Sequence, residues 1–137
     1  MSLEAWRYVR LALFAFAAAI LPLLGTPAHA ITTKDLLRQC EALEKGAVVK
    51  GDSVQLPAGR EPAMCWYYMA AVQDFSATVE EEGGASVLGS CPSSETTRLD
   101  LIRAFTKYAR AHRNDLDVRA SAVLIQALAE AYRCPTR

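Results

Sequence analysis

Residues 61–81 decide the fold, and they read EPAMCWYYMAAVQDFSATVEE. Pro62 suits the first turn of a helix, because proline gives up only a backbone N–H that would have no partner there. Apolar residues then recur every three or four positions along one stripe: Cys65, Tyr68, Met69, Val72, Phe75 and Val79. Such a stripe is typical of an amphipathic helix with one buried face. The stretch therefore predicts a long helix that ends at Glu80 or Glu81.

A shorter apolar repeat precedes this helix, and a segment rich in turn residues separates the two. Thr32 or Thr33 offers an N-cap for a helix that would stop at Gly46. Its inward positions are Leu36, Leu37, Cys40 and Leu43. Residues 46–60 contain three glycines and a proline among polar residues and have no sustained period. We interpret them as a long loop.

Two further helices are predicted after the long one. The third would begin after a cap at Ser93 or Ser94, with an inner face formed by Leu101, Ile102, Phe105, Tyr108 and Ala109. The fourth would be capped by Asn114 or Asp115, with an inner face formed by Val118, Ala122, Ile125, Leu128, Ala129 and Tyr132. No strand pattern, internal repeat or second domain is evident. The predicted fold class is all-α, a small disulfide-stapled bundle of about four helices.

Residues 1–30 have the parts of a secretory signal peptide. Two arginines supply the positive start, an apolar run of about fourteen residues follows, and Ala28-His29-Ala30 has the small-x-small cleavage pattern. We therefore expect cleavage after Ala30 and a periplasmic domain of residues 31–137 with no membrane attachment. An uncleaved anchor is the alternative, although a helix that spans a bilayer needs about 20 apolar residues.

All four cysteines lie in the predicted mature part: Cys40, Cys65, Cys91 and Cys134. An even number in an exported chain of this size implies disulfides rather than free thiols. Four cysteines allow three pairings. The preferred prediction joins Cys65 to Cys91, which would tie the second helix to the third, and Cys40 to Cys134, which would staple the C-terminus onto the first helix. A Cys40–Cys65 bridge would contradict it.

The inventory of catalytic groups is thin, so the sequence predicts no catalytic residue, no metal site and no cofactor. His112 is the only histidine after the predicted signal peptide and is interpreted as a polar residue at a helix end. Cysteines held in disulfides offer neither a nucleophile nor thiolate ligands. Asp74 is interpreted as a hydrogen-bonded structural residue, with a general acid as the alternative. The chain is therefore predicted not to be an enzyme.

Charge argues against nucleic acid and anionic membranes as partners. The predicted mature part carries thirteen Lys and Arg against fourteen Asp and Glu. The distribution is uneven, because residues 61–100 contain seven acids and one base whereas residues 101–137 contain three acids and seven bases. We expect one end of the fold to be acidic and another to be basic.

Two features mark candidate residues for binding a protein partner. The aromatic run Trp66-Tyr67-Tyr68 cannot be buried entirely on one helix, so Trp66 or Tyr67 should be partly exposed as an interface anchor. The alternative is that the loop of residues 46–60 covers them. The acidic turn Glu80-Glu81-Glu82 is either a solvated loop or a surface that steers a basic partner.

The pattern resembles the Rap/Tai family of type VI secretion immunity proteins over about residues 33–135. That family's central motif, Cys-x-Gly-Tyr-Ile-x-Gly-Val-x-Asp, is matched here by Cys65, Tyr68, Val72 and Asp74, and its two glycines are replaced by Tyr67 and Ala71. Two later blocks of the family correspond to Cys91-Pro92 and to an alanine-rich helix that ends at Cys134.

The resemblance implies an exported immunity protein that docks on a cell-wall amidase effector in the periplasm and occludes its active site. Dimers are common in that family, which leaves a homodimer open here. Contacts are expected on the exposed part of the second helix and in the loop from Glu80 to Ser90. The alternatives are a periplasmic acid-stress chaperone, which would expose apolar surface as its carboxylates protonate, and an envelope binding protein of the same fold without an effector.

Overall fold

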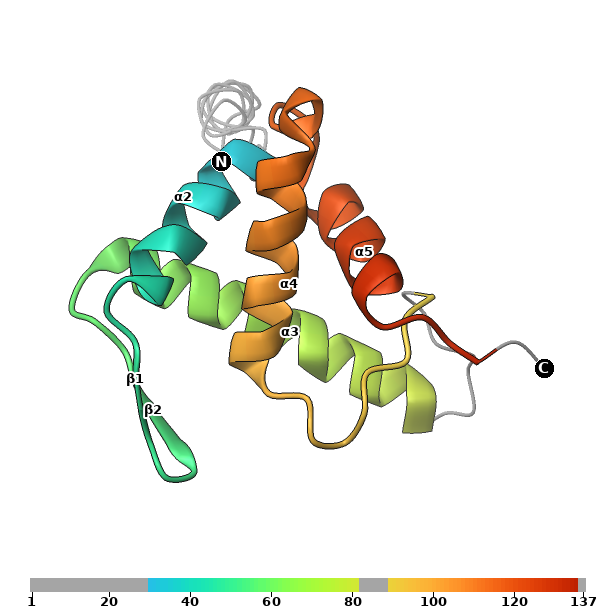
Figure 1. Cartoon of the computed structure of the whole chain (residues 1–137), viewed down its shortest axis with the longest axis horizontal. Coiled ribbons are helices and arrows are strands. Elements are labelled where there is room, and N and C mark those ends of the chain that lie inside the picture. Colours follow the sequence, from blue (N-terminus) through green and yellow to red (C-terminus); the bar gives the residue numbers. More distant parts are fainter. Residues whose placement is uncertain (1–29, 82–88, 136–137) are drawn as a thin grey trace, which may run out of the picture.

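The structure is a computed structural model that describes residues 30–81 and 89–135. Residues 1–29 of the predicted signal peptide and Glu82 of the acidic turn lie outside these ranges. The described residues form four α-helices, a two-stranded hairpin and one short 3-10 turn (Figure 1). Their order is α2 (Thr33–Glu44), β1 (Val48–Lys50), β2 (Ser53–Gln55), α3 (Arg60–Glu81), α4 (Arg98–Ala111), η2 (Arg113–Asp115) and α5 (Ala120–Ala131). The predicted helical fold class is confirmed.

Side-chain caps set the starts of α2 and α4. Thr32 Oγ1 accepts the backbone N–H of Asp35 at 3.2 Å, as the sequence predicts. Thr97 Oγ1 accepts the N–H of Asp100 at 3.3 Å, and Asp100 Oδ2 accepts the N–H of Thr97 at 3.0 Å, which forms a reciprocal capping box. The predicted cap at Ser93 or Ser94 is therefore wrong, because the box at Thr97 satisfies two backbone donors at once.

The start and register of α5 also differ from the prediction. Asn114 and Asp115 lie in η2, and α5 begins after Arg119 with no side-chain cap. Its start is set instead by the segment that precedes α2, because the N–H of Ala120 donates to Ile31 O at 3.0 Å. The shifted helix buries a different set of residues, namely Ala120, Val123, Leu124, Ala127 and Leu128. The predicted inward residues Val118, Ala122 and Ile125 are exposed.

One hydrophobic core joins the four helices. Phe105 and Ile102 of α4 are fully buried, together with Leu36 of α2, Met69 of α3 and Leu124 of α5. The helix α4 crosses the middle of the molecule and packs against the other three helices (Figure 1). Burying one large apolar side chain stabilises the fold by about 1.5–3 kcal/mol, so these residues dominate the packing energy.

All four cysteines form disulfides, but the predicted pairing is wrong. Cys40 is joined to Cys65, and Cys91 is joined to Cys134. Cys40 and Cys65 are fully buried where α2 and α3 pack side by side. The segment before α4 runs beside the C-terminus, where the N–H of Cys91 donates to Tyr132 O at 2.7 Å. Packing between helices and backbone pairing, rather than loop length, therefore decide the connectivity.

Residues 46–60, predicted to be a long loop, contain a β-hairpin. The antiparallel strands pair Val48 with Gln55 and Lys50 with Ser53. Gly51 has a φ of 58°, which a two-residue hairpin turn with glycine in first position requires. The hairpin projects from the helices (Figure 1). Strands of three residues are too short for the alternation by which a strand is recognised in sequence.

Candidate functional site

Two hollows flank the buried face of α3. Cys65 and Met69 lie at the centre of that face and are fully buried. Trp66 and Gln73, which are two helical turns apart, lie on one flank and line a cleft beside the hairpin and α4. On the other flank, Phe75 lines a groove against α5. Tyr68, Val72 and Phe75 of the predicted apolar stripe therefore line the groove, whereas the residues that line the cleft lie outside that stripe.

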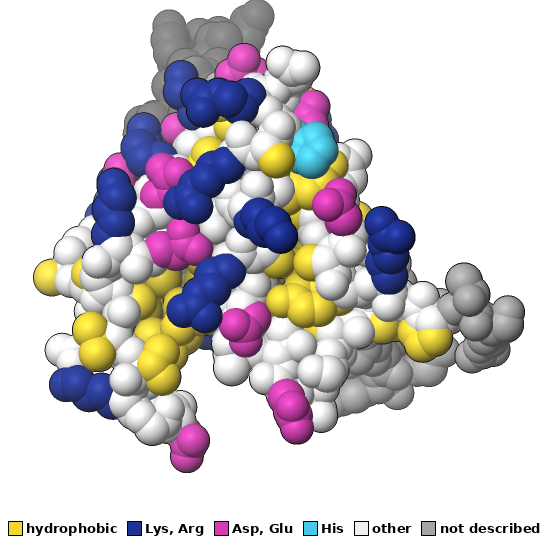
Figure 2. Space-filling view, in the orientation of Figure 1, with side chains coloured by type: hydrophobic (Ala, Val, Ile, Leu, Met, Phe, Trp, Pro, Cys, Tyr) yellow, Lys and Arg dark blue, Asp and Glu magenta, His cyan; other side chains and the backbone are white. Residues whose placement is uncertain are grey.

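The first hollow, which we call the hairpin cleft, has a volume of about 530 Å³. Asp52 and Ser53 at the turn of the hairpin form one wall, Trp66 and Gln73 of α3 form the floor, and Arg98 at the start of α4 lies opposite the hairpin. In the space-filling view, the hairpin and the segment before α4 project on either side of an indentation (Figure 2). The cleft therefore combines an aromatic ring with polar and charged groups.

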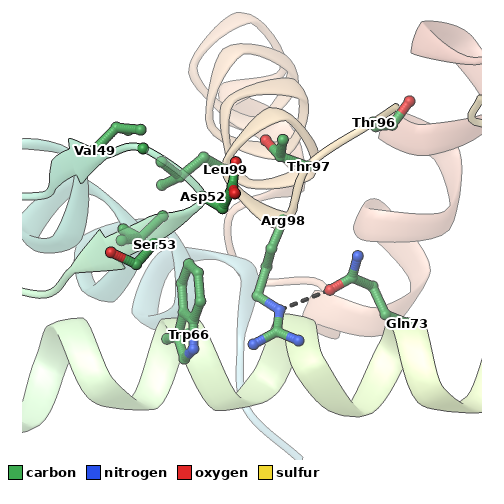
Figure 3. Close-up of a pocket in the computed structure, with 11 residues that line it drawn as sticks. Val49, Asp52, Ser53, Trp66, Gln73, Thr96, Thr97, Arg98 and Leu99 are labelled. Atoms are coloured by element: carbon green, nitrogen blue, oxygen red, sulfur yellow. Dashed lines mark hydrogen bonds between the residues drawn. The ribbon is translucent and has the colours of Figure 1, made fainter. Parts of the chain in front are cut away.

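Arg98 is held in a defined orientation in this cleft. Its Cζ atom lies 4.6 Å from the centroid of the Trp66 ring, which is a cation–π contact. Its Nε donates a hydrogen bond of 2.6 Å to Oε1 of Gln73, so the guanidinium lies between the two side chains (Figure 3). The ion pairs between described residues do not include Arg98, although Asp52 lines the facing wall.

The second hollow, which we call the apolar groove, has a volume of about 280 Å³ between α3 and α5. Seven residues line it: Tyr68, Ala71, Val72, Phe75, Ser121, Leu124 and Ile125. Phe75 was predicted to be buried but is 57% exposed, because it lines this open groove rather than the core. Partial burial in the groove raises the pKa of the Tyr68 hydroxyl.

The structure does not bring the predicted partner-binding residues into one cluster. Tyr67 is 66% exposed on the outer side of α3, whereas Trp66 is half-buried under Arg98. Glu80 and Glu81 belong to the last turn of α3, and fifteen residues of helix place Glu81 about 22 Å along the axis from Trp66. Trp66 and Tyr67 therefore lie far along α3 from the acidic turn.

Sequence reasoning missed Arg98 and the hairpin as parts of a site. A signal for Arg98 was present, because it is the single base among the seven acids of residues 61–100. Its partners could not be foreseen, since Trp66 is more than thirty positions away along the chain and belongs to another helix. The hairpin wall depends on strands too short to be recognised.

His112 and Asp74, the two residues weighed for chemistry, lie apart from both hollows. His112 ends α4, stacks on Tyr108 with ring centroids 3.8 Å apart, and its Nδ1 lies 2.9 Å from Tyr108 O. The prediction of a polar helix-end residue is confirmed. Asp74 is exposed on α3, and its interpretation as a structural residue stays a prediction.

The described part of the chain, residues 30–81 and 89–135, contains neither a cluster of metal-ligating side chains nor a helix that could span a membrane. Within that part of the chain, three or more His, Cys, Asp or Glu side chains do not gather as metal ligands. The helices described there are also too short or too polar to cross a bilayer.

The chain matches the model of a known protein family. The model of a family described as Rap1a immunity proteins matches residues 32–134. No curated protein and no solved structure matches the chain. The matched range contains all the described helices, the hairpin, both hollows and the four disulfide-bonded cysteines. The chain therefore belongs to the Rap1a immunity protein family.

Proposed function

We propose that the mature chain, residues 31–137, is a periplasmic protein that neutralises a peptidoglycan amidase effector of type VI secretion by occluding its active site. Membership of the immunity family supports the class of function, a protein that binds a protein effector. Occlusion needs no catalytic group in the immunity protein, because a bound surface that fills the effector's cleft excludes the substrate.

The observation that carries occlusion is the projecting hairpin. Enzyme active sites are concave, so an element that blocks one must be convex and must keep its shape. The strands β1 and β2 project from the helices, and Val49 near their turn is 58% exposed (Figure 1). A partner that covers Val49 would bury apolar surface, which favours association.

The base of the hairpin is held from both sides. The Cys40–Cys65 disulfide joins the helix before the hairpin to the helix after it and closes a segment with a sequence separation of 25. Gly46 and Pro57 are in close contact at the two ends of the hairpin. A rigid element loses little conformational entropy on binding, so this arrangement favours high affinity.

Residues outside the hairpin that the sequence predicts as partner contacts are also proposed to bind the effector. Tyr67 is available on the outer side of α3 as an aromatic contact. The acidic turn that includes Glu80, Glu81 and Glu82 is proposed to steer a basic partner surface over long range. Export is proposed through a signal peptide of residues 1–30, and the two disulfides are consistent with an oxidising compartment.

The test uses purified, oxidised residues 31–137 and each exported amidase encoded in the same genome. We expect one of these amidases to bind with 1:1 stoichiometry and to stop hydrolysing purified sacculi. Val49→Asp should weaken that binding by at least about tenfold, because the interface would bury an unpaired carboxylate. Val118→Asp is the matched control, since Val118 is 42% exposed but lies beside the start of α2, away from the hairpin.

Binding that leaves the amidase active would contradict occlusion. Equal losses of affinity in the two valine variants would contradict the role of the hairpin. If no amidase is inhibited and the protein instead prevents aggregation of unrelated proteins at acidic pH, the chaperone alternative would replace this proposal.

A further inference from the structure

We propose that the hairpin cleft is a binding site for one acidic side chain, an aspartate or glutamate of a protein partner, and that Arg98 is the residue that binds its carboxylate. The proposal rests on the proposed function only for the nature of the partner, a protein. The chemistry of the site follows from the groups that line the cleft.

Arg98 is prepared to bind a carboxylate. A guanidinium carries five N–H donors in one plane, and only the Nε–H donates to Gln73. No described residue accepts a hydrogen bond from the two terminal nitrogens. These donors form the edge that binds a carboxylate through two parallel hydrogen bonds. The Trp66 ring and the Gln73 amide restrict the side chain, so little rotamer freedom remains to be lost on binding.

The charges around the cleft favour a ligand with a single negative charge. Arg98 is the one cation among the described residues that line it, and Asp52 on the hairpin faces into the same space. Asp52 repels any anion in the cleft, and this repulsion is smaller for one carboxylate paired with Arg98 than for a more highly charged anion such as phosphate. The arrangement therefore selects for an acidic side chain over a phosphate group.

The size of the cleft agrees with a side chain on a loop. Its volume of about 530 Å³ lies within the range of about 300–1,000 Å³ that is usual for ligand pockets. The apolar walls include Val54, Leu99 and the face of Trp66, which would contact the methylene groups of a glutamate. The cleft also adjoins the projecting hairpin, so an effector held by the hairpin would bring its own surface to Arg98.

The test needs no effector, because Trp66 is the only tryptophan of residues 31–137 and its fluorescence reports on the cleft. The probes are the blocked peptides Ac-Gly-Glu-Gly-NH2 and Ac-Gly-Gln-Gly-NH2, with inorganic phosphate as the alternative source of negative charge. We expect the glutamate peptide to bind with a millimolar Kd, at least about tenfold more tightly than the glutamine peptide, because only a carboxylate forms charge-assisted hydrogen bonds. Phosphate should bind less tightly than the glutamate peptide.

Variants assign the effect to the site. Arg98→Gln should abolish the preference for glutamate, and Gln73→Ala should weaken glutamate binding about threefold by releasing the guanidinium. Arg103→Gln is the matched control, because Arg103 lies on the same helix and its ion pair is with Asp100 outside the cleft. Helicity and the two disulfides are measured in each variant. If Arg98→Gln loses native structure, Gln73→Ala and the comparison of the two peptides decide the question.

Several results would overturn the proposal. These are equal binding of the two peptides, tighter binding of phosphate, an unchanged preference in Arg98→Gln, or no saturable change up to about 50 mM peptide, well above the millimolar Kd expected for one such contact. None of these measurements involves an amidase. Failure of the cleft and failure of the proposed function are therefore distinguishable.

Discussion

Gly46 and Pro57 face each other at the base of the hairpin, and a Cβ atom placed on Gly46 would lie only 2.8 Å from Cβ of Pro57. Gly46 follows α2 and Pro57 precedes α3, so this contact brings the two ends of the hairpin together. Glycine is needed at position 46 because a larger side chain would not fit, and not because of its backbone conformation, since Gly46 does not have a positive φ. The absence of a side chain here lets the hairpin leave and re-enter the helical body at one place.

Gly46→Ala should lower the free energy of unfolding by about 1–3 kcal/mol, because the added methyl group overpacks against the proline ring. Urea unfolding followed by circular dichroism measures the change. Pro57→Gly removes the Cβ atom that lies nearest to the added methyl group. Gly46→Ala should therefore cost less in a Pro57→Gly background, which gives a non-zero coupling energy. A single variant as stable as the parent would show that the contact has room to relax.

The two disulfides should make different but substantial contributions to the free energy of unfolding. Replacing Cys40 and Cys65 by alanine opens a loop with a sequence separation of 25, which costs about 3.5 kcal/mol by chain entropy. Replacing Cys91 and Cys134 opens one with a separation of 43 and costs about 4 kcal/mol. Urea unfolding tests both pairs. Peptide mapping of the unreduced protein tests the connectivity directly, and a Cys65–Cys91 peptide would refute it.

Contacts between α2 and α4 should differ in strength with burial. Thr106 is buried and donates a hydrogen bond of 2.9 Å to Glu44, whereas Arg110 forms its ion pairs with Glu41 and Glu44 at the surface. Thr106→Val should cost about 1 kcal/mol. Arg110→Gln should cost about 0.5 kcal/mol or less, because solvent screens exposed pairs. Thermal and urea unfolding compare the two, and a larger loss in Arg110→Gln would reverse this ranking.

The capping box should make the free energy of unfolding decrease at acid pH. Hydrogen bonds from Thr97 hold the pKa of the Asp100 carboxyl below its ordinary range. A carboxyl whose pKa is lower in the folded state stabilises the fold above its unfolded pKa, and that contribution is lost as the pH falls below about 4 through the folded pKa. Asp100→Asn should therefore reduce the difference in unfolding free energy between neutral and acid pH.

NMR titration of the Asp100 carboxyl measures this pKa directly. Thr97→Ala removes the hydroxyl donor and should raise the pKa of Asp100 toward its ordinary range. The effect on stability is small because Asp100 is partly exposed to solvent. An Asp100 pKa that is unchanged in Thr97→Ala would contradict the capping box as its cause.

Helices whose ends and buried faces depend on neighbouring residues could be predicted closely from the sequence. The apolar repeat and the turn residues around it placed α2 and α3 within a residue or two of their observed ends. In α4 four of the five predicted inner residues are buried and the fifth, Tyr108, is half-buried, although the predicted cap was wrong. Helical periodicity is a property of neighbouring residues, so it can be read without knowledge of the partner surface.

The candidate site could be predicted only in fragments. Trp66 and Tyr67 were recognised as candidates because consecutive aromatics on a helix cannot all be buried. Arg98 was not, since its importance comes from its contact with Trp66 across two helices. The hairpin wall of the cleft was missed for a similar reason, because three-residue strands are stabilised by each other rather than by their own sequences.

The sequence by itself determined that the described residues of this protein form four helices and two disulfides, and it determined most of the buried faces of α2 and α4, because those depend on residue type and short-range spacing. Only the tertiary structure decided which cysteines pair, where α5 begins and how Arg98 lies over Trp66. Each of these depends on two segments that are distant in the chain and meet only when the core has packed. Their geometry is set by the helix surfaces that fit together, which no local spacing specifies.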